Sequence, residues 1–365
     1  MQVADNPQLL SIMLEDTRHA PDIYKPTNYW SVYENKFAPE LRRLGLHDFR
    51  RRKGSILSTF GGTDLSSSFG IDLSRSRLFN NRITRRVPVL SGLISLLNAF
   101  LNYVMPVAAP YNLTVQEIRE LSYILARTEG EKVGARSIAE LDASLVGNPE
   151  DIFEVDGKVY TMSVLYYYLR YVYCCNYIDF ARTKVIVELG SGAGKQVEVI
   201  KKLHPDICFL LFDIPPQLYV CESYLDAVFP ESIVSYKDTR NLESIPDARE
   251  GKIFIFGNWK FPILEKTKID LFWNAASFQE MEPDVVANYL TYVNRQASFV
   301  FLQEAMSGKE VAKRIGEHGV LRQTTLEDYK NGLKDFELLD VSPSLSPVGR
   351  RGPGYSDSFW KRTVL

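Results

Sequence analysis

A short apolar run leads into glycines at every second position, in the pattern Glu-x-Gly-x-Gly-x-Gly from Glu188 to Gly194. The β-branched residues at 185–187 predict a buried parallel strand, and the glycines predict a tight turn into a helix that begins near Lys195. Glycines allow the backbone to approach a bound ligand where a Cβ would collide with it. The stretch therefore predicts a strand, a ligand-binding loop and a helix N-terminus.

The glycine spacing separates the known nucleotide-binding loops. A Walker A loop has four residues between its first Gly and the Gly-Lys-Ser/Thr end, whereas three residues separate Gly190 from Gly194 and Gln196 stands at the hydroxyl position. This excludes a Walker A loop. A dinucleotide fingerprint has Gly or Ala where this chain has Lys195, which disfavours NAD and leaves it open.

A carboxylate follows at the distance that a nucleoside ligand requires. The predicted helix Lys195–Leu203 is followed by an apolar run at 207–212, a second buried strand that ends at Asp213. An acidic residue about 20 residues after the glycine loop is placed to accept hydrogen bonds from ribose hydroxyls. The alternative is that Asp213 only caps the turn before Pro215.

Ligands of open parallel sheets bind at the carboxyl ends of the strands. Asp238 follows the predicted third strand at 233–236 and is suited to accept a hydrogen bond from an adenine amino group, unless it pairs with Arg240. The loop 274–281 follows the predicted strand 269–273, and Glu304 follows the strand at 298–303. These loops are the other candidate positions for chemistry.

Strands and helices alternate from residue 184 onward, which predicts an α/β, Rossmann-like sheet. The last two predicted strands, 336–341 and 357–364, are joined by a Pro-, Gly- and Ser-rich segment and should form an antiparallel hairpin. The preceding part is mostly helical, with predicted helices at 31–44, 114–128 and 161–179. The predicted division is therefore a helical region at 1–180 and a sheet domain at 181–365.

Composition indicates an ordinary water-soluble protein: 365 residues, a net charge of −2, 45% hydrophobic and 24% charged residues. Between Arg42 and Arg86 there are eleven basic and three acidic residues, which suggests either an anionic ligand or a solvated basic face. The uncharged stretch 89–105 has one polar helical face, so it predicts a buried helix rather than a membrane span. With four cysteines, no metal-type spacing and no signal-peptide pattern, we expect a cytoplasmic protein without a structural metal.

Three segments together resemble the bacterial sugar O-methyltransferase family of the class I S-adenosylmethionine-dependent methyltransferases: 188–194, 212–216 and 274–281. The segments 28–30 and 146–149 extend this resemblance over most of the chain. It implies a Rossmann-like sheet with a terminal antiparallel hairpin, S-adenosyl-L-methionine as cofactor, and methyl transfer to a sugar hydroxyl. It also implies a lid and acceptor site in the helical region. The resemblance and the spacing together predict these cofactor-binding residues: Glu188, Gly190, Ser191, Gly192, Gly194, Asp213, Ile214 and Asp238.

A sugar hydroxyl needs to lose its proton as it is methylated, so a carboxylate or an imidazole should act as general base. The predicted base is Glu280, with Asn274 and Gln279 orienting cofactor or acceptor and Glu304 as the second choice. Alternatively, Glu280 caps the predicted helix 283–295. The loop 274–281 lacks the Asn/Asp-Pro-Pro-Tyr/Phe pattern of enzymes that methylate nitrogen, which favours oxygen.

Other functions stay open. The acceptor could be another small hydroxylated natural product. A rival of a different class is a non-catalytic module that senses the cofactor and binds nucleic acid through the basic segment. We expect a small-molecule acceptor, no nucleic acid and no membrane, with a homo-oligomer possible.

Overall fold

The computed structural model describes residues 3–51, 115–247, 249–347 and 351–363, together with 93, 96 and 97. Most of the basic segment and of the stretch 89–105 therefore lies outside the described residues. The three described leucines of that stretch are helical but 43–70% exposed, in contrast to the buried helix expected there. No helix within the described ranges is long and apolar enough to cross a membrane.

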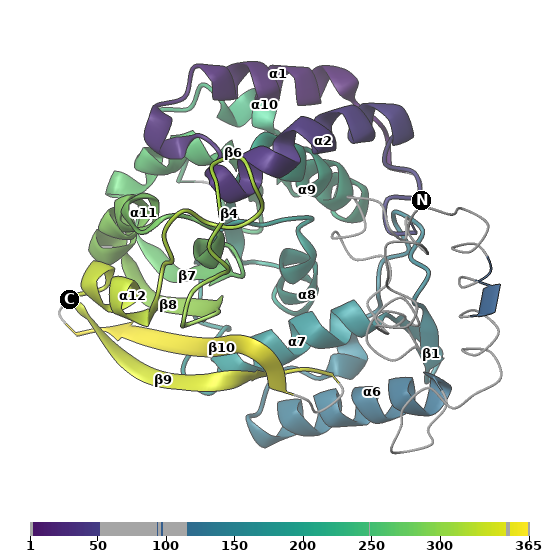
Figure 1. Cartoon of the computed structure of the whole chain (residues 1–365). Coiled ribbons are helices and arrows are strands. Elements are labelled where there is room, and N and C mark those ends of the chain that lie inside the picture. The colour runs from purple at the N-terminus through teal and green to yellow at the C-terminus, as the bar shows by residue number, and fades with distance from the viewer. Residues whose placement is uncertain are drawn as a thin grey trace.

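The centre of the molecule is a sheet of eight strands in the order β5-β6-β4-β3-β7-β8-β10-β9 (Figure 1). Pairing is parallel from β5 through β8, and β10 is antiparallel to both of its neighbours. This arrangement confirms the predicted Rossmann-like class with a terminal antiparallel hairpin. The strands of this sheet are β3 (Val185–Leu189), β4 (Cys208–Asp213), β5 (Ile233–Val234), β6 (Ile253–Gly257), β7 (Ile269–Ala275), β8 (Ala297–Glu304), β9 (Phe336–Leu345) and β10 (Arg351–Arg362).

The first part of the described chain is mostly helical, as predicted, with one small hairpin. Its elements are α1 (Pro7–Arg18), η1 (Asp22–Tyr24), α2 (Asn28–Leu44), α6 (Val115–Lys132), η4 (Ile138–Glu140), β1 (Phe153–Val155), β2 (Lys158–Tyr160) and α7 (Met162–Cys175). Asp156 and Gly157 both have positive φ, which is the turn type that closes a two-residue hairpin. These two residues connect β1 to β2, which pair in antiparallel fashion.

Helices and short 3₁₀ segments connect the strands of the sheet. They are α8 (Lys195–Leu203), α9 (Pro215–Val228), α10 (Tyr236–Thr239), η5 (Asn258–Lys266), η6 (Phe278–Glu280), α11 (Pro283–Gln296) and α12 (Leu326–Gly332). The predicted third strand at 233–236 is only two residues long, because residues 236–239 are helical. The strand that lies beside β4 is instead β6.

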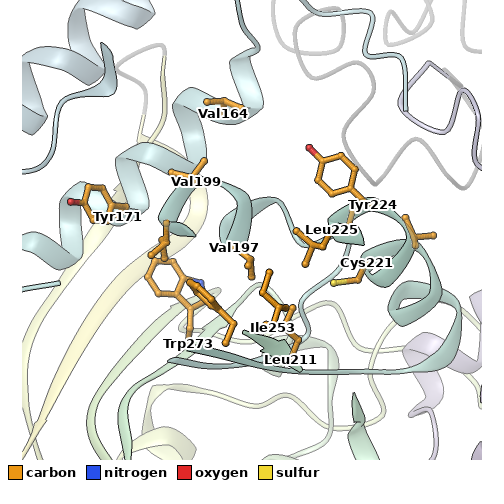
Figure 2. Close-up of a cluster of buried hydrophobic side chains, with 14 of the residues drawn as sticks. Val164, Tyr171, Val197, Val199, Leu211, Cys221, Tyr224, Leu225, Ile253 and Trp273 are labelled. Atoms are coloured by element: carbon orange, nitrogen blue, oxygen red, sulfur yellow. The ribbon is translucent and has the colours of Figure 1, made fainter. Parts of the chain in front are cut away.

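Each central strand buries both of its faces, because alternate side chains point to opposite sides of the sheet. In β4, Phe209 and Leu211 belong to one hydrophobic core, whereas Leu210 and Phe212 belong to the other. The first core is shared with α7, α8 and α9, and the second with η5, α11 and α12. Figure 2 shows part of the first core, where Val197 of α8 lies near Leu211 and Ile253.

The N-terminal helices pack directly against the helices of the sheet domain. Both α1 and α2 contact α9, and Figure 1 shows them together at the top of the molecule over α9 and α10. Leu9, Leu10 and Met13 of α1 share the hydrophobic core that includes Leu211 of β4. A division of the chain near residue 180 stays a prediction, since the core continues across it.

Leu211 gives a test of this packing. It is fully buried in β4 and pairs with positions on both β3 and β6. We expect Leu211→Ala to lower the free energy of unfolding by about 2–5 kcal/mol, through lost burial and the cavity left behind. Urea unfolding measures this, with Leu121→Ala as the control because Leu121 is 51% exposed. Equal losses in the two variants would contradict the assigned core.

Candidate active site

A cavity of about 360 Å³ lies at the carboxyl ends of β3, β4, β6 and β7. Its floor includes the glycine loop after β3 and the residues that follow β4, and α2 and α7 supply further parts of its wall. This is the position where open parallel sheets bind ligands. It brings together six of the eight predicted cofactor-binding residues: Glu188, Gly190, Ser191, Gly192, Asp213 and Ile214.

The three glycines of the loop differ in what a side chain would meet. All have positive φ, which disfavours other residues. A Cβ at Gly190 would lie 2.4 Å from the Ser277 hydroxyl oxygen, and one at Gly194 would lie 2.6 Å from a Leu225 methyl carbon. A Cβ at Gly192 would meet nothing within 4 Å. Gly192 therefore keeps space open for a ligand, whereas Gly194 does not line the cavity and serves the packing of the helix start.

Asp213 joins the loops that follow two neighbouring strands. Its Oδ2 accepts a hydrogen bond from Gly192 N at 2.8 Å, and its Oδ1 accepts one from Ile214 N at 2.7 Å. Burial raises the pKa of Asp213 to about 7, although these two hydrogen bonds oppose the rise. Each carboxylate oxygen has a further acceptor site, so Asp213 can also receive hydroxyl groups of a ligand.

Glu188 is the second buried carboxyl group of the cavity. It is 6% exposed, at the end of β3, and burial raises its pKa to about 8. The nearby Arg170 guanidinium opposes this rise, whereas Asp213 adds to it. Glu188 is therefore mostly protonated at neutral pH, and a bound cation would favour its ionised form.

The structure contradicts the predicted place of Asp238. This residue is exposed on α10 and is not part of the cavity wall, while Arg240 pairs with Asp16 at 2.5 Å. The error follows from the sheet order, since the strand beside β4 is β6 and not β5. Asn258, directly after β6, lines the cavity in its place. Its amide nitrogen donates to Tyr24 O and the Tyr289 hydroxyl, and its Oδ1 is buried without a described partner.

Glu280 lies in the cavity wall, as its predicted role requires. Its Oε1 is 3.1 Å from the Lys309 ammonium. Burial raises the pKa of Glu280, and this rise is opposed by Lys309 and by hydrogen bonds from Tyr29 and Trp30. The N-cap of α11 is Glu282, so the alternative that Glu280 caps this helix is wrong.

The other two predicted catalytic residues, Asn274 and Gln279, do not line the cavity. Asn274 is fully buried, donates to Leu189 O and accepts from Phe278 N. Gln279 is also fully buried and binds the Tyr355 hydroxyl and Ala305 N. Both side chains hold the turn that carries Glu280. Glu304, the second choice for the base, is buried beneath this turn and accepts from Gln279 N.

The aromatic side of α2 is a part of the site that we did not predict. Tyr29, Trp30, Tyr33 and Phe37 line the cavity and have ring centroids 5.4–6.2 Å apart. The sequence does contain a signal for this side of the site, because residues 29, 30, 33 and 37 have the spacing that places side chains on one side of a helix. Of the six tyrosines predicted on the helix 161–179, Tyr167 lines the cavity.

The start of α2 is attached to the segment that follows β8. The Asn28 side chain donates to Glu317 O and Gly319 O and accepts from Gly316 N. The Thr27 hydroxyl donates to Glu280 O at 2.9 Å. His318 is exposed, with its ring centroid 5.1 Å from that of Tyr29, and His204 is bound to the Tyr171 hydroxyl away from the cavity. Neither histidine lines the cavity.

The high pKa of Glu188 predicts a pH-dependent stability. The folded protein holds a proton on Glu188 that the unfolded chain releases above pH 4.5, so stability falls as pH rises from about 4.5 to about 8. Glu188→Gln removes this loss, and we expect the variant to exceed the native protein by on the order of a few kcal/mol at pH 9.

Urea unfolding at pH 5 and pH 9 measures the difference. At pH 5 the two proteins should be nearly equal. The control is Glu265→Gln, because the Glu265 side chain is 63% exposed and should show no such dependence. A Glu188→Gln variant with the native pH profile would show that Glu188 is already ionised at neutral pH in the folded protein.

A scan of the sequence against protein-family models found no match, and neither did a search of curated proteins. Solved structures similar to the chain include the pyocyanin biosynthetic protein PhzM, at 13% identity and a TM-score of 0.34, covering 52% of this chain and 53% of PhzM. The mitomycin 7-O-methyltransferase MmcR is similar at 12% identity and a TM-score of 0.33, covering 51% of each chain. The O-methyltransferase NcsB1 from neocarzinostatin biosynthesis, solved in complex with S-adenosyl-L-homocysteine and 1,4-dihydroxy-2-naphthoic acid, is similar at 14% identity and a TM-score of 0.35. The similarity covers 55% of this chain and 56% of NcsB1. This chain thus spans about half the length of these three proteins.

Proposed function

We propose that this protein is an S-adenosylmethionine-dependent O-methyltransferase that methylates a hydroxyl group of a sugar or a glycosylated small molecule. One observation carries the proposal: Gly192, whose missing side chain leaves open space, and the Asp213 carboxylate meet in one cavity at the carboxyl ends of the sheet. This combination suits a ligand whose ribose binds Asp213 and whose neighbouring group lies along the glycine loop.

The residues present fit the cofactor part by part. Asp213 has acceptor sites for the two ribose hydroxyls, and Ile214 offers an apolar side chain in the same wall. The buried Oδ1 of Asn258 has no described partner and can accept from the adenine amino group. Asn258 thereby takes the role first expected of Asp238.

The acceptor side of the cavity supports a sugar. Tyr29 and Trp30 on α2 present ring surfaces next to the Glu280 carboxyl group. Sugars have apolar C–H faces that pack on aromatic rings, and hydroxyl groups that donate to carboxylates. The helical N-terminal region then serves as lid and acceptor site. Another hydroxylated natural product with an apolar face is the alternative acceptor.

The bound cofactor would supply an electrophilic methyl group. The protein's own contribution is to orient the acceptor hydroxyl and to receive its proton at Glu280, whose raised pKa brings it closer to that of a general base at neutral pH. Lys309 keeps the Glu280 carboxylate in place. The aromatic side of α2 limits the access of water to the reacting groups.

Cofactor binding tests the role of Asp213. We expect Asp213→Ala to weaken S-adenosylhomocysteine binding by roughly 10- to 100-fold, because charge-assisted hydrogen bonds to the ribose are lost. Calorimetric titration measures this, with NAD as the control ligand. Asp238→Ala is the matched control, since Asp238 is exposed outside the cavity and its loss should leave the affinity unchanged. Native binding of NAD alone would sink the proposed cofactor.

Turnover tests the role of Glu280. We expect Glu280→Gln to reduce kcat by roughly 100-fold or more while the S-adenosylhomocysteine affinity stays within a few-fold, because only the proton acceptor is lost. The measurement is formation of S-adenosylhomocysteine with a panel of free, nucleotide-linked and glycosidic sugars. Glu317→Gln, at an exposed position, serves as control. A fully active Glu280→Gln enzyme would rule out Glu280 as base.

A further inference from the structure

Tyr355 of β10 contacts two groups that support Glu280, although Tyr355 itself lies outside the cavity wall. Its hydroxyl oxygen accepts a hydrogen bond from Gln279 Nε2 at 2.8 Å. The same side chain also interacts with the Lys309 ammonium group, through a hydrogen bond and through charge. A hydroxyl oxygen has two lone pairs, so it can accept from both donors at once. The terminal hairpin therefore reaches the surroundings of the proposed base.

Gln279 is the first connection from Tyr355 to Glu280, because it directly precedes Glu280 in η6. Its side chain is fully buried, and its Oε1 accepts a hydrogen bond from Ala305 N at 2.6 Å. Its backbone nitrogen donates to Glu304 Oε2 at 3.0 Å. Together with the contact to Tyr355, three hydrogen bonds hold the residue before Glu280. One of these three depends on the Tyr355 hydroxyl group.

Lys309 is the second connection. Its ammonium nitrogen lies 3.1 Å from Glu280 Oε1, and its side chain is 23% exposed. Burial lowers the pKa of Lys309, but the charge of Glu280 and the contacts with Tyr355 more than offset this, so the pKa is raised overall. A lysine carries its charge on a flexible four-carbon stem, which does not by itself fix the place of the charge. A second acceptor besides Glu280 limits how far the ammonium group can turn towards water.

The place of the Lys309 charge matters because it offsets the cost of burying the Glu280 carboxylate. Burial raises the pKa of Glu280, and the charge of Lys309 is the largest of the effects that oppose this rise. The other groups that interact with Glu280 are either neutral donors of α2 or acidic groups coupled to it by charge. They are Tyr29, Trp30, Asp213 and Glu304.

We propose that Tyr355 is a positioning residue for the general base: its hydroxyl group holds Gln279 and Lys309, and these two residues fix the Glu280 carboxylate beside its counter-charge. This rests on the proposed function, in which Glu280 is the base. The terminal hairpin then contributes to catalysis as well as closing the edge of the sheet. Without the hydroxyl group, the ammonium group of Lys309 is less firmly held beside Glu280, and the carboxyl group keeps its proton to a higher pH.

The test removes one oxygen atom and follows the protonation of Glu280 directly. In protein labelled with ¹³C at the glutamate carboxyl carbons, the NMR signal that disappears in Glu280→Gln belongs to Glu280. We expect Tyr355→Phe to raise the pKa of Glu280 by roughly 0.5 to 1 pH unit, because the opposing charge is held less firmly. Lys309→Met should raise it further. Adding Tyr355→Phe to Lys309→Met should change little more, since the two residues act through one connection.

Tyr177→Phe is the matched control, because Tyr177 also packs against β10, where its ring centroid lies 4.7 Å from that of Phe359. This variant loses a hydroxyl group as well and should leave the pKa of Glu280 unchanged. Turnover gives a second measurement that a merely structural role would not move. In Tyr355→Phe the acidic limb of the kcat profile should shift to higher pH by the same amount, with S-adenosylhomocysteine affinity within a few-fold.

An unchanged or lowered pKa of Glu280 in Tyr355→Phe would overturn the proposal. An equal rise in Tyr177→Phe would also overturn it, since the loss of any hydroxyl group beside β10 would then suffice. A fully active Glu280→Gln enzyme would instead reject Glu280 as the base. That result concerns the proposed function, whereas the NMR titration needs neither cofactor nor acceptor, so the two failures are distinguishable.

Discussion

The hydrogen bond from Gly192 N to Asp213 Oδ2 connects the two loops on which the cavity depends. It is possible because β3 and β4 are parallel neighbours in register, with Leu189 opposite Phe212, so both strands end at the same level. A second link between these loops runs from Gly190 N to Phe212 O at 2.8 Å. The glycine loop therefore has its shape before any ligand binds, and the carboxylate that shapes it also faces the ligand.

Burying carboxyl groups around one cavity has a thermodynamic cost. Burial raises the pKa of Glu188, Asp213 and Glu280 alike. Asp213 adds to the rise at Glu188, and Glu280 adds to the rise at Asp213. Well-packed apolar residues would give a more stable fold at these positions. Such strained electrostatics are typical of functional sites, where ligand contacts offset the cost. The cations already present, Arg170 and Lys309, are placed beside Glu188 and Glu280 respectively.

The parts predicted from sequence are those with local signals. The glycine loop, Asp213 and the terminal hairpin follow from patterns within a few residues, and each is where the sequence placed it. Asp238 failed because the order of strands depends on contacts distant in sequence, and a two-residue edge strand precedes β6. Asn274 and Gln279 lie outside the cavity wall for another reason: a polar residue after a strand can bind backbone as readily as a ligand. The spacing of the aromatic residues of α2 places them on one side of a helix, but only tertiary packing brings that side to the cavity.

The attachment of α2 has a consequence for how the cavity can open. Tyr29 and Trp30 line the cavity and donate to Glu280, while Thr27 and Asn28 hold the helix start on the Glu280 turn and on residues 316–319. A displacement of α2 that widens the entrance would remove these donors from Glu280 in the same motion. Opening of the cavity entrance would therefore also change the proton affinity of Glu280. Opening would also hydrate Glu280, and because burial is the largest cause of its raised pKa, hydration would lower that pKa while the lost hydrogen bonds would raise it.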